Sequence, residues 1–151
     1  MKRVLRDVML GGGCALLVAC AGDDEATTSF AIQVHVPLAT SPCDVASATA
    51  SLSGPVRHID PTPLEVTDDA IHGALLDVPV GRQHQVFVEV YDSSGLEVYS
   101  GNSTVDVTTG IEIPASIFLS SNGKNCPGGG TENSRLIGRL EQITVDAASG
   151  P

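Results

Sequence analysis

The chain has 151 residues, 42% of them hydrophobic, and carries 18 acidic against 8 basic side chains, for a formal net charge of −10. This length predicts a single domain. Affinity for nucleic acid comes from neutralising phosphates with Lys and Arg, so a surface this acidic argues against a nucleic-acid partner.

The N-terminal 19 residues are typical of a secretory signal. Three basic residues come first, and an apolar run from Val8 to Ala19 follows them. This run is shorter than the about 20 residues that a membrane-spanning helix needs. We therefore expect residues 1–19 to be removed, which leaves 17 acidic and 5 basic residues in the mature chain.

The end of this segment resembles the lipobox of bacterial lipoproteins, because it reads Leu17, Val18, Ala19 and Cys20. The resemblance implies that Cys20 carries lipid as the first residue of the mature chain, so the membrane is reached through that lipid. An outer-membrane address is implied too, since Ala21 rather than Asp follows the cysteine. An ordinary signal peptide is the alternative.

Segments without periodicity flank the middle of the chain. Residues 20–29 are small and acidic, which predicts a disordered tether. Residues 123–151 begin at a Gly-rich break and continue as a tail. Leu136, Leu140 and Ile143 have the spacing of a short helix and Ile143 and Val145 that of an added strand, and a frayed end is the third alternative. The folded domain is therefore expected over residues 30–122.

Alternating apolar residues predict β-strands throughout this domain. Val86, Val88 and Val90 repeat at period two, and Ile113 and Ile117 share one phase later, which places one face of each strand in a core. Seven strands are expected, over residues 30–36, 46–52, 56–67, 70–78, 83–91, 96–107 and 111–119. The sixth changes phase along its length, which predicts a bulge at residues 100–102.

Seven strands separated by turn signals, with no helical segment among them, predict an all-β fold, a seven-stranded antiparallel β-sandwich. Residues 76–101 and 105–110 resemble a repeat of bacterial secreted β-sandwich modules, including the prealbumin-like, carboxypeptidase-regulatory-like and Ig-like (fibronectin type III-like) groups. The resemblance implies an Ig-like or prealbumin-like sandwich, and such modules are mostly non-catalytic.

The cysteines predict one disulfide. If Cys14 leaves with the signal and Cys20 is acylated, Cys43 and Cys126 remain as a pair in an oxidising compartment. Cys43 follows the first expected strand and Cys126 the seventh. In an up-and-down arrangement odd strands end at the same pole, so the two sulfurs can meet.

No catalytic or metal-binding pattern is found, and we expect neither an enzyme nor a bound cofactor. The histidines are assigned to the outward phases of two strands (His35 and His84), a Pro-rich connection (His58) and a turn (His72). Only His72 has carboxylates close in sequence, Asp68 and Asp69, and a solvated turn explains this group better than a metal site.

The expected function is therefore a non-catalytic, lipid-anchored envelope protein with a binding or structural role toward an unknown protein or envelope partner. Phe87, Tyr91 and Phe118 lie on the phase opposite the expected core, so they either face that partner or bury against the tail or second sheet. Two alternatives stay open, a small-ligand carrier and a calcium-stabilised adhesion module. The adhesion module would use Asp68, Asp69 and Asp92.

Overall fold

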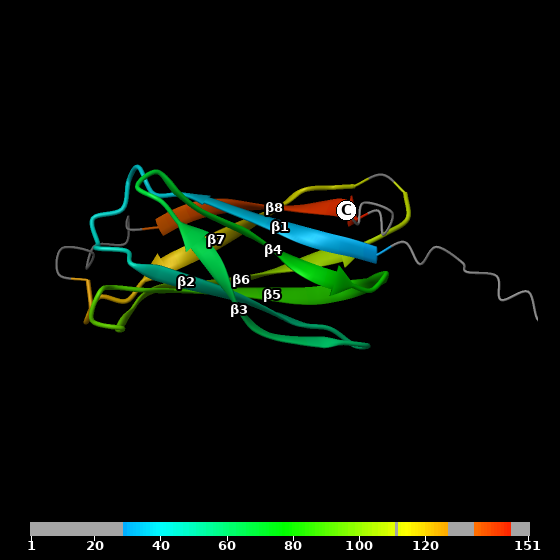
Figure 1. Cartoon of the computed structure of the whole chain (residues 1–151), viewed down its shortest axis with the longest axis horizontal. Coiled ribbons are helices and arrows are strands. Elements are labelled where there is room, and N and C mark those ends of the chain that lie inside the picture. The colour runs from blue at the N-terminus through cyan, green and yellow to red at the C-terminus, as the bar shows by residue number, and fades with distance from the viewer. Residues whose placement is uncertain (1–28, 111, 127–134, 146–151) are drawn as a thin grey trace, which may run out of the picture.

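The computed structural model describes residues 29–110, 112–126 and 135–145, which form eight β-strands in one closed antiparallel barrel (Figure 1). Around the barrel the order is β1-β4-β3-β2-β5-β6-β7-β8, and β8 pairs with β1. The predicted all-β class is confirmed. The strands are β1 (Ser29–Pro37), β2 (Ser47–Ser53), β3 (His58–Val66), β4 (Ala70–Val78), β5 (Gly81–Tyr91), β6 (Glu97–Val107), β7 (Ala115–Ser121) and β8 (Arg135–Val145).

The prediction of a seven-stranded sandwich is wrong, because β8 is an eighth strand that closes the sheet. It pairs with β1 from Ser29↔Val145 to His35↔Arg139, and with β7 from Ala115↔Leu140 to Ser120↔Arg135. Without β8, the facing sides of β1 and β7 would be unpaired edges. The added strand was one of three structures that the sequence left open for this segment.

Burial along β8 alternates as a strand requires, with Leu136, Gly138, Leu140 and Gln142 facing inward. Gly138 is needed because a Cβ there would lie 2.6 Å from a methyl carbon of Val36 and 2.9 Å from the His35 carbonyl oxygen. Gly138 therefore allows the strand to pack closely.

The barrel has two short seams. β3 and β4 pair only at Glu65↔His72 and Val66↔Ile71, because Pro61 and Pro63 occupy the preceding part of β3 and cannot donate hydrogen bonds. β6 and β7 pair only at Tyr99↔Ser121 and Ser100↔Ser120.

At the second seam the two backbones approach very closely. A Cβ on Gly101 would overlap the carbonyl oxygen of Phe118, so only glycine fits where β6 crosses β7. Beyond this point the strands diverge, and the Ser103 hydroxyl bridges them by donating to the Ser116 carbonyl oxygen at 2.8 Å. The seams divide the ladder of the barrel into two runs of four strands, β4-β1-β8-β7 and β3-β2-β5-β6.

Apolar side chains from all eight strands pack together inside the barrel as one core. The largest, Tyr99, is fully buried, and its hydroxyl lies 3.0 Å from Ser41 Oγ in the β1–β2 loop. Ile113, expected in the core, is instead 86% exposed, because β7 begins only at Ala115, after Pro114. Ile111 lies outside the described residues.

Two bulges adjust the pairing of β5 with β6. One lies at Val98, where Val90↔Tyr99 is followed by Tyr91↔Glu97, and not at residues 100–102 as expected. The other lies between Gly81 and His84. There Gln83 takes a φ of 61°, and its N–H donates to Asp106 Oδ1 at 2.8 Å.

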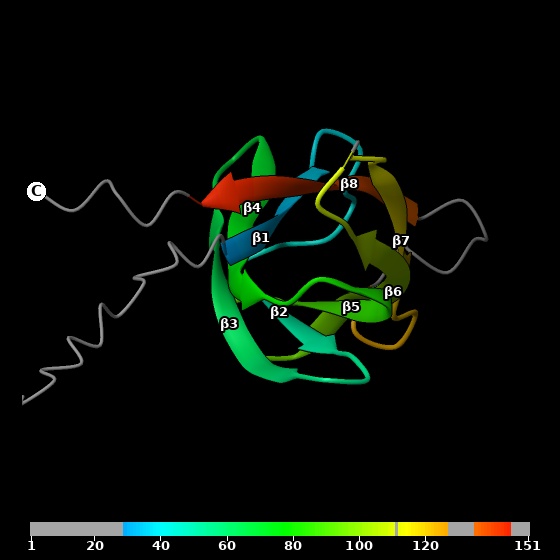
Figure 2. The same ribbon diagram turned by 90° about the vertical axis from the view of Figure 1, so that its right-hand side faces the viewer.

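The strand directions define two ends of the barrel. The Ser29 end holds the start of β1 and the connections 54–57, 79–80 and 108–114, and Figure 2 looks onto it. The disulfide end holds connections 38–46, 67–69 and 92–96 and residues 122–126. The residue that begins β1, Ser29, was expected in the tether.

The predicted disulfide is confirmed. Cys43 and Cys126 are bonded, with 5.4 Å between their Cα atoms. The bond joins the β1–β2 loop to the segment after β7, and Cys126 is buried. It therefore ties the β1–β2 loop to the end of β7 at one end of the barrel.

Replacing both Cys43 and Cys126 by Ala should lower the free energy of unfolding. The bond joins residues 83 apart, and closing so long a loop stabilises a fold by about 4.5 kcal/mol in the chain-entropy model. Urea unfolding with and without reductant measures the effect. The double variant should not respond to reductant, and an unchanged midpoint for reduced wild type would contradict the assignment.

Candidate functional site

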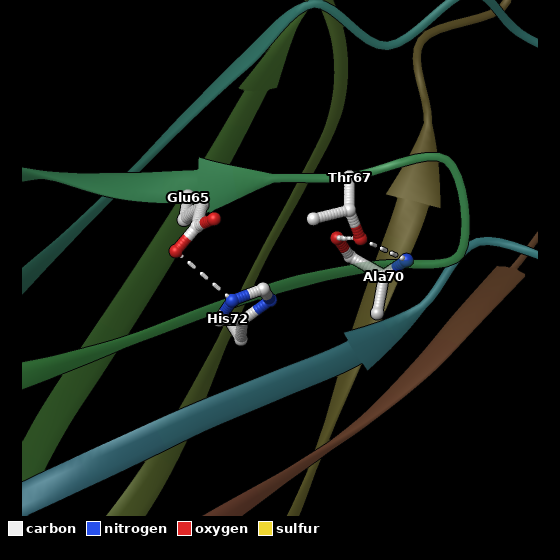
Figure 3. Close-up of polar contacts among 4 residues, drawn as sticks. All are labelled: Glu65, Thr67, Ala70 and His72. Atoms are coloured by element: carbon white, nitrogen blue, oxygen red, sulfur yellow. Dashed lines mark hydrogen bonds and ion pairs between the residues drawn. The ribbon is translucent and has the colours of Figure 1, made fainter.

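The hairpin of β3 and β4 holds the one histidine that the sequence placed near carboxylates. His72 Nε2 lies 3.1 Å from Glu65 Oε2 (Figure 3). The two residues are register partners across the strands, so His72 pairs with Glu65 and not with Asp68 or Asp69. Both side chains are largely exposed, and a surface pair of this kind contributes at most about 1 kcal/mol.

The turn of this hairpin is closed by Thr67 and Ala70. The Thr67 N–H donates to the Ala70 carbonyl oxygen at 2.9 Å, and the Ala70 N–H donates to Thr67 Oγ1 at 3.2 Å (Figure 3). Asp68 and Asp69 occupy the exposed tip. The Asp69 carbonyl oxygen also accepts a hydrogen bond from the Leu38 N–H, so the tip is fixed against the β1–β2 loop.

Asp92, the third carboxylate of the calcium alternative, caps the β5–β6 turn. Its Oδ1 accepts hydrogen bonds from the Ser94 N–H at 2.8 Å and the Leu96 N–H at 2.9 Å. Within the described parts of the chain, no three His, Cys, Asp or Glu side chains are grouped so that they could hold a metal ion.

The histidines are distributed over separate parts of the barrel. His35 is exposed, as expected, and its register partner is Arg139. His58 lies 3.4 Å from Asp60 on the exposed start of β3.

The assignment of His84 to an outward phase is wrong, because its side chain is fully buried. The sequence pattern indicates this burial, because His84 shares its phase with Val86, Val88 and Val90, which line the core. The Gln83 bulge precedes His84 and leaves that phase intact.

The His84 imidazole lies between two glycines. A Cβ on Gly54 would overlap Nδ1, and one on Gly81 would lie 3.0 Å from Nε2. Neither ring nitrogen has a hydrogen-bond partner within the structure. A buried imidazole without partners costs stability, since it has given up its hydrogen bonds to water.

The three aromatic residues expected to face a partner lie on the outside of two different strands. Phe87 and Tyr91 are half-buried on β5, whereas Phe118 on β7 is 51% exposed. Phe118 pairs across the strands with Ile137, which is also exposed. The structure thus brings Phe118 next to an apolar neighbour from the C-terminal segment and keeps it on a different strand from the other two.

The phenol of Tyr91 has a raised pKa. Burial raises the pKa of its phenol above the usual 10.0, and the hydrogen bond from its hydroxyl to Glu89 Oε2, at 3.0 Å, raises it further. Tyr91 is therefore held as a neutral donor on the outer face of β5.

Two hollows lie at the Ser29 end. One, of about 500 Å³, opens where β6 and β7 diverge and is lined by residues that include Arg82, Asp106 and Ile113. The other, of about 260 Å³, lies beside the start of β1 and is lined by residues that include Ser29, Arg57 and Val80. The first residue of the barrel therefore shares a hollow with two of the connections at this end.

The predicted lipidation site, Cys20, lies outside the described residues, as does the signal. No known family model matches the chain, and no curated protein is detectably similar to it. In the part of the chain that the structure describes, no helix has the length and apolarity needed to cross a membrane.

Replacing Tyr91 by Phe should alter stability at alkaline pH. A raised folded-state pKa means that the contribution of the phenol is fully present below about pH 10 and is lost as the pH rises through the folded-state value. The free energy of unfolding of wild type should therefore fall above about pH 10, whereas Tyr91→Phe has no phenol to ionise and should not show this fall. Below about pH 10 the two free energies should differ by a constant amount. Parallel curves from urea unfolding would contradict this.

Replacing His84 by Leu should leave stability unchanged or raise it. The substitution removes two buried, unpaired nitrogens whose desolvation costs about 1–3 kcal/mol. Leu52→Ala, at a fully buried position, is the comparison and should cost about 2–5 kcal/mol. A loss for His84→Leu as large as that for Leu52→Ala would mean that the ring has a partner, such as a bound water. Thermal unfolding of both variants decides between these outcomes.

Proposed function

We propose that this chain is a lipid-anchored protein of the bacterial cell envelope whose barrel has a binding or structural role. The first support is the order of Leu17, Val18, Ala19 and Cys20 after a basic start and an apolar run. Cleavage before Cys20 leaves its thiol to carry the lipid. Ala21 then directs the mature protein to the outer membrane.

The disulfide between Cys43 and Cys126 is the observation that carries the proposal. Cytosolic thiols are kept reduced, whereas disulfides persist in secreted and periplasmic proteins. This argument is independent of the signal, because it depends on cysteines in the folded barrel. Two separate parts of the chain therefore support export.

A binding or structural role is favoured over catalysis by how the polar side chains are used. His72 and Glu65 form an exposed pair, Asp92 caps a turn, and His84 contacts glycines. Nucleophilic catalysis requires a nucleophile, a base and a group that orients the base to lie within hydrogen-bond reach of one another, and none of these side chains is arranged in this way.

The small-ligand carrier is the weaker alternative because the inward side chains pack against one another. The core extends from Phe30 and Val78, near the Ser29 end, to Leu38 and Tyr99, near the disulfide end. An eight-stranded barrel can be filled by side chains or can hold one small ligand, and the packed core of this barrel favours the first. We therefore propose that recognition occurs on the outer surface, with an unknown protein or envelope component as partner.

Metabolic labelling with palmitate tests the anchor. Wild type should incorporate label, and globomycin should block its processing, whereas Cys20→Ala should incorporate none, because no other cysteine follows a lipobox. Cys14→Ala is the matched control, since this cysteine follows three glycines and should leave labelling intact. Label retained by Cys20→Ala would overturn the proposal.

A further inference from the structure

The Ser29 end differs from the rest of the barrel surface in its apolar tips. Each of its three connections carries one large exposed aliphatic side chain: Val56 is 76% exposed, Val80 52% and Ile113 86%. Figure 1 shows these connections and the start of β1 at the same end of the barrel. Single exposed apolar residues are ordinary, but one on each connection at one end is a pattern that marks an interaction surface.

Charge separates the two ends. The described connections of the disulfide end carry four aspartates and one lysine: Asp44, Asp68, Asp69, Asp92 and Lys124. Those of the Ser29 end carry one arginine and one acid, Arg57 and Glu112, and Arg82 follows the 79–80 connection. Asp77 and Asp106 lie at the same depth as Arg82, each one residue from the end of β4 and β6, and these exposed carboxylates line the hollows of Arg57 and Arg82.

Within the described residues, neither Arg57 nor Arg82 forms an ion pair. Both guanidinium groups are on exposed residues that line the hollows of this end. An anionic lipid surface would therefore repel the disulfide end, with four aspartates against one lysine, more strongly than the Ser29 end, where two arginines lie among Glu112, Asp77 and Asp106.

The anchor leaves from the Ser29 end as well. Eight residues lie between Cys20 and Ser29, and even fully extended the nine steps from one to the other span at most about 32 Å. Ser29 itself lines the hollow shared with Arg57 and Val80. A lipid on Cys20 would thus keep this end within reach of the bilayer.

We propose that the Ser29 end docks on the bilayer, with Val56, Val80 and Ile113 in the headgroup region and Arg57 and Arg82 next to lipid phosphates. This inference rests on the proposed lipidation of Cys20. The lipid supplies the attachment, and the apolar tips set the orientation. The acidic disulfide end then points away from the membrane and is the end presented to a partner.

Fluorescence quenching in vesicles tests this orientation. Full-length chains with Val80→Cys, Ile113→Cys or Leu96→Cys are labelled with an environment-sensitive fluorophore. They are then reconstituted through their own lipid into phosphatidylethanolamine–phosphatidylglycerol vesicles that contain nitroxide lipid. Leu96 is the matched control for Val80, because the two side chains are 50% and 52% exposed on turns at opposite ends of the barrel. Probes at positions 80 and 113 should be quenched several-fold more than the probe at position 96.

A second variant checks that the tips cause the orientation. Val56→Asp with Ile113→Asp should relieve the quenching of a probe at position 80, whereas Leu96→Asp should not. Equal quenching at both ends, or stronger quenching at position 96, would overturn the proposal. So would a shift of the position-80 probe without vesicles, because that would assign this end to contact between copies of the chain.

The intact mass of the same samples distinguishes a failure of the docking proposal from a failure of the proposed lipidation of Cys20. A sample without lipid on Cys20 refutes the proposed anchor, and the quenching data then have no bearing on orientation. A lipidated sample with unquenched probes at the Ser29 end refutes only the docking.

Discussion

The pairing of β8 with both β1 and β7 is the constraint on which the rest of the structure depends. Because β8 occupies the space between them, every strand has two neighbours and the sheet has no open edge. Closure requires close backbone approach at particular positions, and glycine provides it at Gly138 in β8 and at Gly101 where β6 crosses β7. The apolar core then fills a barrel whose shape these contacts determine.

The strands could be predicted wherever apolar residues alternate over several positions. Val86, Val88 and Val90 are all fully buried, as their period implies. The eighth strand was less certain, because Leu136 and Leu140 fit the spacing of a helix, whereas Ile143 and Val145 fit that of a strand. What decides the matter is the close packing around Gly138, where methyl groups of Val36 and Ile117 leave no room for a Cβ, and a local pattern cannot show it.

The polar groups could be predicted only in part, for the same reason. The disulfide was predictable, because strand parity alone brings Cys43 and Cys126 to one end. The pairing of His72 with Glu65 depends on the register between β3 and β4, which the sequence does not reveal. His84 was misplaced because it is polar, although its phase is that of the core. The space for its ring comes from Gly54, on the β2–β3 connection, and Gly81, the first residue of β5.

The antiparallel pairing of β1 with both β8 and β4 has a mechanical consequence. Ser29 is paired with Val145, and its neighbour Phe30 with Val78, so a pull on the start of β1 along the barrel acts parallel to these strands. The hydrogen bonds of both ladders then bear the load together in shear and do not open one after another as in unzipping. A barrel held at Ser29 and loaded at its far end would therefore resist extension.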